Sequence, residues 1–417
     1  MASYGYGSAQ ELLKIVYDTE TIRSLVPEHV GIWNKFKKWD EPGDPGGKWF
    51  EFAVTTAWPN SVGSMPLTSG VVRTPSIPVD VNGRVYARQF HATMAMEQSL
   101  VSLSAKNPQA FAKALDHLKG TLLMRLARLR VLNIYGNHAG TQAYVNQTVN
   151  NVTFAVNGQY GFLKGNGAKV DKGAEVFMPG ERIVIDPDGT PQYRIIASTN
   201  PTAGTITCTV AANVVSGMKI CFGESGSMDY NNNADGFADL LAPVSAGAYL
   251  NIDPATSPTW IANRYTGSTA GTEEPLDSSH VFRIVNGTAV NSGADVNIII
   301  AHSNMMQEFA QYFEQQVQYQ PGTKWVGGMK ELGWNIGGKA VSTFFDATAP
   351  HNCLIGLTES ELARFVADEG GWNGMGGEVF HPIAGTTQWI AQWVELWNVG
   401  TRKRNAHAIQ MDLSEPI

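Results

Sequence analysis

The chain is 417 residues long, and 43% of its residues are hydrophobic whereas only 16% are charged. That length allows the cores of two or three domains, and the charged fraction is below the roughly 25% of an average soluble domain, which favours a surface that meets other proteins. The formal net charge of -7 excludes a domain-wide basic field for gripping a phosphate backbone, so sequence-specific nucleic-acid binding is not expected.

The cysteines and the first residues indicate the cellular compartment in which the protein is expected. Cys208, Cys221 and Cys353 are odd in number and widely spaced, so they predict neither a disulfide framework nor a CxxC metal pair. No basic region followed by an apolar run opens the chain, and no stretch of about 18 apolar residues occurs, so neither a secretory signal nor a membrane span is predicted. A reducing cytoplasm and no membrane partner are expected.

The first 57 residues predict helical turns and then a strand. Ser8-Ala-Gln-Glu11 is a capping box that predicts an N-terminal helix. Trp33, Phe36 and Trp39 indicate a further amphipathic turn or two, and the alternation in Lys48–Ala57 predicts a strand.

The next segment, 61–90, is rich in glycine and proline and poor in large apolar residues. Asn82-Gly83 stands between the β-formers of 77–81 and 85–87, and Asn-Gly is the strongest short signal for a tight hairpin turn, because both turn residues take φ > 0. A hairpin has too little apolar area to fold alone. We therefore expect it to lie against something else, such as another subunit.

The clearest element is a helix over Asn107–Tyr135. Asn107 can cap it, Pro108 fits its first position because the missing N–H costs nothing there, and Gly136 ends it. An apolar stripe at spacings of four and three predicts one buried side, with basic residues on the other sides. The stripe comprises Phe111, Leu115, Leu118, Leu122, Leu126 and Leu129, and the basic set comprises Lys113, Lys119, Arg125, Arg128 and Arg130. Periodicity alone indicates a core helix of a large domain.

The region after the helix predicts a β-rich insertion and then alternating elements. Short strands separated by turn clusters favour a small barrel or sandwich. These strands are Glu175–Phe177, Arg182–Ile185, Tyr193–Ala197, Thr205–Val210 and Lys219–Phe222. Later strands are predicted at Phe282–Ile284, Val296–Ala301, Lys339–Asp346, Gln388–Leu396 and His407–Leu413, and helices at Ser303–Gln318 and, after the capping box Thr358–Glu361, up to Val366.

Catalytic and ligand-binding motifs are incomplete. Gly333–Lys339 nearly matches a phosphate loop, but Ala340 has no hydroxyl for magnesium and the run leads into a strand. Asp229–Gly236 lacks the turn glycine of a calcium loop, and the bidentate glutamate is also missing. His351-Asn-Cys353 indicates a buried structural cysteine, and the nine histidines form no i, i+4 ligand pair. We therefore predict no catalytic, metal-binding or cofactor-binding residues, and no cofactor.

The order of elements resembles the Hong Kong 97-type fold of tailed-phage major capsid proteins. Gly47–Val54 looks like the strand that opens into that family's extended loop, and Asn107–Gly136 looks like its spine helix. Met178-Pro-Gly180 with its β-rich run is similar to an insertion of some phage capsid proteins, and Gly333–Val341 is similar to the family's axial strand pair.

The resemblance implies an α+β, Hong Kong 97-like phage capsid fold with a small β-rich insertion domain. The implied parts are an N-terminal arm and first strand (1–57), an extended-loop hairpin (58–94), a peripheral domain with the spine helix 107–135 (95–150), the insertion (151–228), an axial domain (229–385) and returning peripheral strands (386–417). Axial domains of this fold surround the five-fold and six-fold axes of a shell, and extended loops lie over neighbouring subunits.

The function implied is that of a major capsid protein that self-assembles into the icosahedral shell around the double-stranded DNA of a tailed phage. The implied partners are copies of itself in pentamers and hexamers, a separate scaffolding protein, a portal, and packaged DNA bound without sequence specificity. The implied location is the virion capsid, assembled in the host cytoplasm.

The loop suggests which residues make contacts between subunits. No lysine occurs between Lys48 and Lys106, so the lysine–asparagine crosslink of some relatives is excluded for this loop. Our hypothesis is that Arg73, Arg84 and Arg88 form ion pairs with acidic neighbours, with Asn82 and Gly83 at the turn. Solvated surface arginines are an equal alternative.

Two other functional classes stay open at this point. One is a phage tail or baseplate protein, or an encapsulin-type shell protein. The other is a β-rich hydrolase using a carboxylate pair such as Asp368 and Glu369, although adjacent residues of a strand point to opposite faces.

Overall fold

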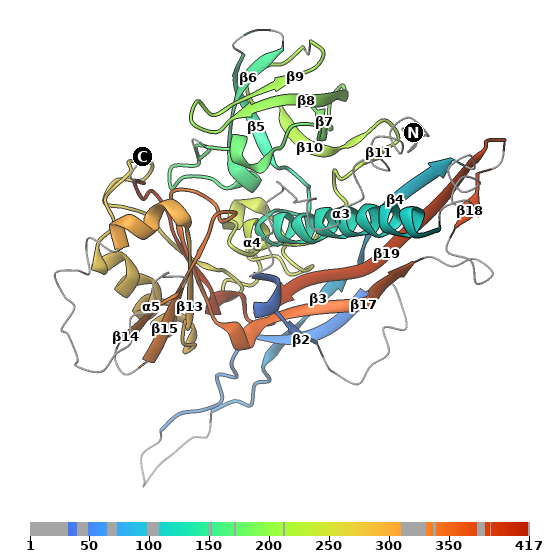
Figure 1. The fold of residues 1–417 in the computed structure, drawn as a ribbon. Helices are drawn as coiled ribbons and strands as arrows, with labels where there is room; N and C mark the ends of the chain where they lie inside the picture. Colours follow the sequence, from blue (N-terminus) through green and yellow to red (C-terminus); the bar gives the residue numbers. More distant parts are fainter. Residues whose placement is uncertain are drawn as a thin grey trace, which may run out of the picture. The chain divides into compact units, whose positions relative to one another are not determined.

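The computed structural model describes residues 32–39, 49–64, 73–97, 108–148, 150, 152–170, 172–211, 213–309, 331–336, 339–372, 380–383 and 385–415. The chain divides into two compact units. Unit 1 comprises Met1–Asn34, Ala87–Val131 and Val366–Trp397, and unit 2 comprises Lys35–Tyr86, Leu132–Phe365 and Asn398–Ile417. Strands dominate both, so the class is α+β as predicted (Figure 1). The predicted N-terminal helix lies outside the described residues.

Unit 1 holds long antiparallel strands and most of one long helix. β4 (Arg88–Glu97) pairs with β19 (Gln388–Thr401), which also pairs with β18 (His381–Pro382) and neighbours β17 (Leu362–Trp372). The helix, α3, runs over Pro108–Tyr135, which confirms its predicted extent. None of the helices among the described residues combines the length and apolarity needed to cross a bilayer.

The basic residues of α3 do not all face outward. Leu126 is buried as predicted, but Arg128 is only 3% exposed, so its predicted place on a polar surface is wrong. Arg130 makes a bidentate ion pair with Glu395 of β19, and its guanidinium lies 5.2 Å from the centre of the Trp33 ring. The arginines have apolar stems and strong fixed charges, so they can pack beneath the surface when paired.

The last turn of α3 belongs to unit 2 and is fixed there. Tyr135 is buried, stacks on Tyr160 at 5.9 Å, and donates a hydrogen bond to Asp346 at 2.8 Å. Gly136 then closes the helix with a backbone bond to Leu132.

A six-stranded sheet forms the main core of unit 2. Its strand order is β12 (Asn263–Tyr265), β20 (Ala408–Gln410), β16 (Leu354–Leu357), β13 (Ile298–His302), β15 (Lys339–Asp346) and β14 (Glu331–Ile336). Helix α5 (Ser278–Ser292) buries Val281, Ile284 and Val285 against this sheet. β14 and β15 pair as antiparallel neighbours, so the described residues of the near-match to a phosphate loop, 333–336 and 339, lie on strands.

A small barrel also belongs to unit 2, as one of the two predicted alternatives. Its strands are β5 (Ala143–Thr148), β6 (Thr153–Asn157), β7 (Arg182–Ile185), β8 (Gln192–Asn200), β9 (Thr205–Cys208) and β10 (Lys219–Glu224), with β11 (Ser227–Met228) beside β10. Pairing of β10 with β7 closes the ring. The strand predicted at Glu175–Phe177 is instead a 3₁₀ turn, Ala174–Val176.

Two further sequence predictions are wrong. Phe282–Ile284 lies inside α5, where Asp277 caps the helix and the 3.6-residue period of the buried side prevails over the β propensity. The Thr358 capping box starts a 3₁₀ turn, Glu359–Glu361, that runs into β17, because the Thr358 hydroxyl donates to the carbonyl oxygens of Asp295 and Ala406.

The prediction of a hairpin turn at Asn82-Gly83 is also wrong. Both residues lie within β3 (Val79–Tyr86), which pairs with β2 (Trp49–Ala57), and Gly83 stands opposite Phe52. A Cβ atom on Gly83 would lie 2.5 Å from the Phe52 ring. Glycine is therefore used here for the close approach of a ring and not for a turn.

We predict that Gly83→Ala destabilises unit 2 by about 1–3 kcal/mol, because the buried Phe52 ring must move away from its site. Urea unfolding of the purified protein measures this. Gly371→Ala in β17 is the matched control, because its Cβ meets open space. Equal stability of the two variants would contradict the packing argument.

We predict that Glu395→Gln costs about 3–5 kcal/mol, because Glu395 is 1% exposed and its loss leaves Arg130 without its buried counter-charge. The double variant Arg130→Met/Glu395→Gln should recover part of that loss. Thermal unfolding of the subunit gives both values, and a double variant less stable than either single one would refute the pairing.

Candidate functional site

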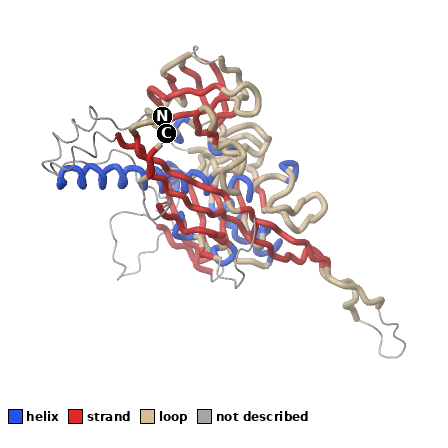
Figure 2. The backbone as a smooth tube through the Cα atoms, turned by 90° about the vertical axis from the view of Figure 1, so that its right-hand side faces the viewer, coloured by secondary structure: helices blue, strands red, loops and turns tan. Residues whose placement is uncertain are grey.

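The β2–β3 pair forms a two-stranded sheet separate from the other three sheets. Beyond the ends of its strands, residues 58–64 and 73–78 continue without regular structure. Figures 1 and 2 show these segments running out together, away from the six-stranded sheet of unit 2. We call residues 49–64 and 73–86 the arm.

The root of the arm is held by an aromatic cluster within unit 2. Phe52 lies 6.4 Å from Phe365 and 6.5 Å from Trp260, and Trp39 lies 4.9 Å from Phe365, measured between ring centres. Aromatic pairs at such separations add to the free energy that burial alone provides.

Backbone hydrogen bonds complete this attachment. The Arg84 amide donates to the Leu250 carbonyl at 2.9 Å, and the Thr259 hydroxyl donates to the Thr56 carbonyl at 2.9 Å. The root of the arm is therefore fixed to the rest of unit 2 by both packing and hydrogen bonds.

Large apolar side chains are exposed on the outer part of the arm. Trp58 is 87% exposed, Ile77 is 85% exposed and Val62 is 78% exposed, and Val79 is also exposed. Single exposed apolar residues are ordinary, but several on one segment make the arm a candidate contact surface.

The structure brings only some of the predicted contact residues together. Asn82 donates to the Glu51 carboxylate at 3.2 Å, and Arg84 donates to the same oxygen at 3.3 Å, with its guanidinium 5.2 Å from the centre of the Trp49 ring. Gly83 lies between them in β3. These side-chain hydrogen bonds of Asn82 and Arg84 thus lie within the arm itself.

The other two predicted arginines lie apart from this group. Arg73 donates to the Val62 carbonyl at 2.7 Å, which joins the two segments of the outer arm. Arg88 belongs to β4 of unit 1 and not to the arm. Sequence reasoning concentrated on charge and missed Trp58, Val62 and Ile77, although isolated large apolar residues in a Pro/Gly-rich segment were a usable signal.

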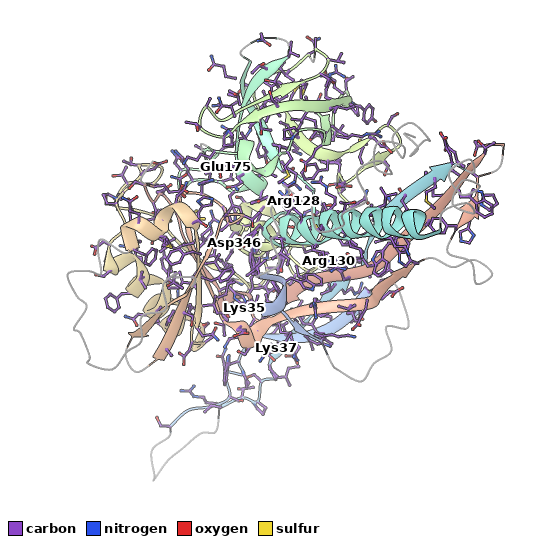
Figure 3. The ribbon with its side chains drawn as sticks, viewed as in Figure 1. Lys35, Lys37, Arg128, Arg130, Glu175 and Asp346 are labelled. Carbon is purple, nitrogen blue, oxygen red and sulfur yellow. The ribbon has the colours of Figure 1, made fainter. Side chains whose placement is uncertain are left out.

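A second constellation, buried in unit 2, was also missed by sequence reasoning. The His351 ring has Glu415 at 2.6 Å from its Nδ1 and Glu175 at 2.8 Å from its Nε2, and the His302 ring centre lies 3.8 Å from that of His351. Figure 3 shows Glu175 beside the barrel. The four residues lie far apart in sequence, so no local spacing marks them.

These contacts shift the ionisation of the cluster. Burial disfavours a charged His351, but hydrogen bonds to Glu175 and Glu415 outweigh it and raise its pKa. Burial likewise opposes the ionised form of Glu415, yet the His351 contact lowers the Glu415 pKa to about 2. Burial and the neighbouring His351 lower the pKa of His302 to about 4.

Ligand atoms of Glu175, His302 and His351 lie within 4.8 Å of one another, which suits a metal by distance. The hydrogen bonds argue otherwise. His302 Nδ1 accepts the Asn304 amide at 3.2 Å, so the proton of the neutral ring sits on Nε2, which lies 3.1 Å from the Ala347 carbonyl. A metal-binding histidine needs the reverse arrangement, with its second nitrogen donating. The cluster is therefore a hydrogen-bonded bridge.

Comparison with known proteins places the fold. No protein-family model and no curated protein matches the sequence. A chain of the cyanophage A-1(L) capsid asymmetric unit superposes with a TM-score of 0.55 at 10% identity, covering 96% of this chain and 99% of that one. A chain of the native GTA particle capsid, computed with C5 symmetry, gives 0.52 at 9% identity, covering 95% and 94%. This protein has the fold of those capsid chains. At these identities the similarity concerns the fold alone.

We predict that Arg84→Glu increases amide hydrogen exchange in β2 and β3, because it places two carboxylates beside each other at Glu51. Both side chains are partly exposed, so the cost is below about 1 kcal/mol. The exchanged pair Glu51→Arg/Arg84→Glu should restore protection. No recovery in the exchanged pair would show that Arg84 serves another partner.

Proposed function

We propose that this protein is the major capsid protein of a tailed phage, with a Hong Kong 97-like fold, and that it self-assembles into the icosahedral shell around double-stranded DNA. The supporting observation is a capsid-type fold over nearly the whole chain combined with an arm whose outer apolar side chains are exposed. Such an arm is stable in water only at a cost that burial against a neighbour would remove.

The arm fits the part of an extended loop that lies over an adjacent subunit. Burying a side chain such as Trp58 or Ile77 contributes about 1.5–3 kcal/mol, and a closed shell repeats that contact at every equivalent position. Contacts of Arg73, Asn82, Gly83, Arg84 and Arg88 with a neighbouring subunit stay a prediction, and so does the pairing of the three arginines with acidic neighbours.

The remaining parts of the proposal follow from the capsid role. Copies would form pentamers and hexamers, a separate scaffolding protein and a portal would assist assembly, and packaged DNA would be met without sequence specificity. The protein would reside in the virion capsid after assembly in the host cytoplasm. In the proposed layout, α3 is the spine helix of a peripheral domain (95–150 and 386–417), and the barrel strands other than β5 belong to the insertion (151–228). The strands of the six-stranded sheet other than β20 belong to the axial domain (229–385). Residues 1–57 form the N-terminal arm and first strand, and 58–94 form the extended loop.

The hydrolase alternative finds no support at the carboxylates that motivated it. Asp368 and Glu369 are adjacent on β17 and exposed, and Asp368 accepts a hydrogen bond from the Gly370 amide at 3.0 Å. A glycosidase needs two carboxylates that face one substrate from opposite sides. Two solved structures with a similar fold are capsid chains, which favours a shell role over a tail or baseplate role.

We predict that Trp58→Ser/Ile77→Ser raises the protein concentration needed for shell assembly at least about tenfold, because each truncated contact loses more than about 1.4 kcal/mol. Electron microscopy and sedimentation of purified protein measure this. Circular dichroism should show the variant folded, because both side chains are exposed in the subunit.

Val290→Ser on α5 is the matched control, because that side chain is equally exposed but lies off the arm. The control should assemble as the natural protein does. Closed shells formed by the double variant at unchanged concentration would refute the role of the arm, and rings or tubes formed by the natural protein would refute the capsid function.

A further inference from the structure

The bridge at His351 connects three parts of unit 2 that are distant in sequence. Glu175 lies in the 3₁₀ turn beside the barrel, His351 follows β15, and Glu415 lies in the C-terminal segment. The side chains of His351 and Glu415 are almost fully buried. Any change in the charge of this bridge therefore acts on the attachment of the C-terminal segment.

The hydrogen bonds define the proton count of the bridge. Both ring nitrogens of His351 face a carboxylate oxygen, at 2.6 Å and 2.8 Å. Ionised carboxylates only accept hydrogen bonds, so the ring must donate from both nitrogens, and only imidazolium can do that. The charge of His351 is compensated on both sides, as a buried charge requires.

The bridge holds the end of the chain through a small network. The second oxygen of Glu415 accepts the Asn352 amide at 2.8 Å, and the Asn352 side chain donates to the Leu413 carbonyl at 2.8 Å. The Leu413 amide in turn donates to the Asn352 carbonyl at 3.0 Å. Releasing Glu415 would thus loosen the segment 411–415.

His302 sets a second limit on the same bridge. Its ring lies 3.8 Å from that of His351, and the hydrogen bond from the Asn304 amide to its Nδ1 requires that nitrogen to be unprotonated. A proton added to His302 would break this hydrogen bond and place two imidazolium rings side by side. The bridge is therefore stable when His351 carries a proton on each ring nitrogen and His302 carries a proton on Nε2 alone.

We propose that Glu175, His351, His302 and Glu415 form a proton-controlled latch that holds the C-terminal segment 411–415 near neutral pH and releases it on either side. The titratable and charged groups around His351 belong to several elements. They are Glu175, Lys172, His302 and Glu415, and Glu308 and Cys353 interact with Glu415. Lys172 lies 3.6 Å from Glu415 and balances the second carboxylate, and burial raises the pKa of the Cys353 thiol, so that it stays neutral.

The pKa shifts of His351 and His302 determine how the stability of the closed latch changes with pH. The pKa of His351 is raised in the closed latch, so its contribution is complete below its ordinary pKa and is lost as pH rises through the raised value. His302 has its pKa lowered to about 4, so opening is favoured as pH falls from about 6.5 toward 4, because the opened state takes up the proton. Because each transition involves one proton, the equilibrium constant for opening changes by at most tenfold per pH unit.

Hydrogen exchange of the full-length, unassembled subunit between pH 5 and pH 10 tests the latch, with rates corrected for intrinsic exchange. Protection of the segment around Asn352 and Leu413 should be greatest near neutral pH and fall on both sides. Amides of α5 should show no such profile, which separates opening of the latch from global unfolding. Flat protection of the C-terminal segment in the natural protein would overturn the proposal without any variant.

Variants distinguish the loss of protection at high pH from the loss at low pH, which we call the alkaline limb and the acid limb of the profile. His351→Gln should remove the alkaline limb. His302→Gln should remove the acid limb and leave the alkaline limb. Glu415→Gln keeps an oxygen that can accept a hydrogen bond from His351, and it should move the alkaline limb to lower pH. This variant replaces His351→Gln in the test if His351→Gln does not fold.

His91→Gln is the matched control, because that histidine is exposed on β4 of unit 1. It should retain both limbs. Persistence of the alkaline limb in His351→Gln would refute the assignment. The test uses unassembled protein, so its result is independent of the capsid function.

Discussion

The packing of Phe52 against Phe365 and Trp260 is the constraint on which the projecting arm depends. A two-stranded sheet buries too little surface to fold alone, so the β2–β3 pair depends on the aromatic cluster at its root. Gly83 makes this possible, because its missing side chain leaves room for the Phe52 ring. One residue without a side chain and one buried ring thereby fix where an otherwise coreless segment leaves the body of unit 2.

The same arrangement explains the unusual surface of the arm. Trp58, Val62 and Ile77 are exposed, and the described residues beyond the root, 58–64 and 73–78, form no core of their own. A chain with only 16% charged residues gives little compensating polarity. Under the proposed function, a neighbouring copy would cover this exposed apolar area and remove it from water.

Local signals in the sequence were sufficient for elements that are stabilised locally. The helix α3 was predicted because its first proline, its apolar period and its closing glycine act within the element itself. The turn predicted at Asn82-Gly83 was wrong because Gly83 makes room for the ring of Phe52 on the preceding strand, and its backbone does not form a turn. The His351 bridge could not be predicted at all, since Glu175, His302 and Glu415 meet it only through the tertiary fold.

Buried charge in this protein is placed where distant segments must be joined in one arrangement. Arg130 and Glu395 join α3 to β19 in unit 1, and His351 with its two carboxylates joins the C-terminal segment to the barrel side of unit 2. Apolar contacts could supply equal stability with less geometric demand, because a buried ion pair pays for desolvation before it gains. The ionic joints instead have a single satisfactory geometry, and the one built on histidine also depends on pH. Unit 2 thus combines an apolar arm, suited to contact with other molecules, with an internal joint whose closure depends on protons.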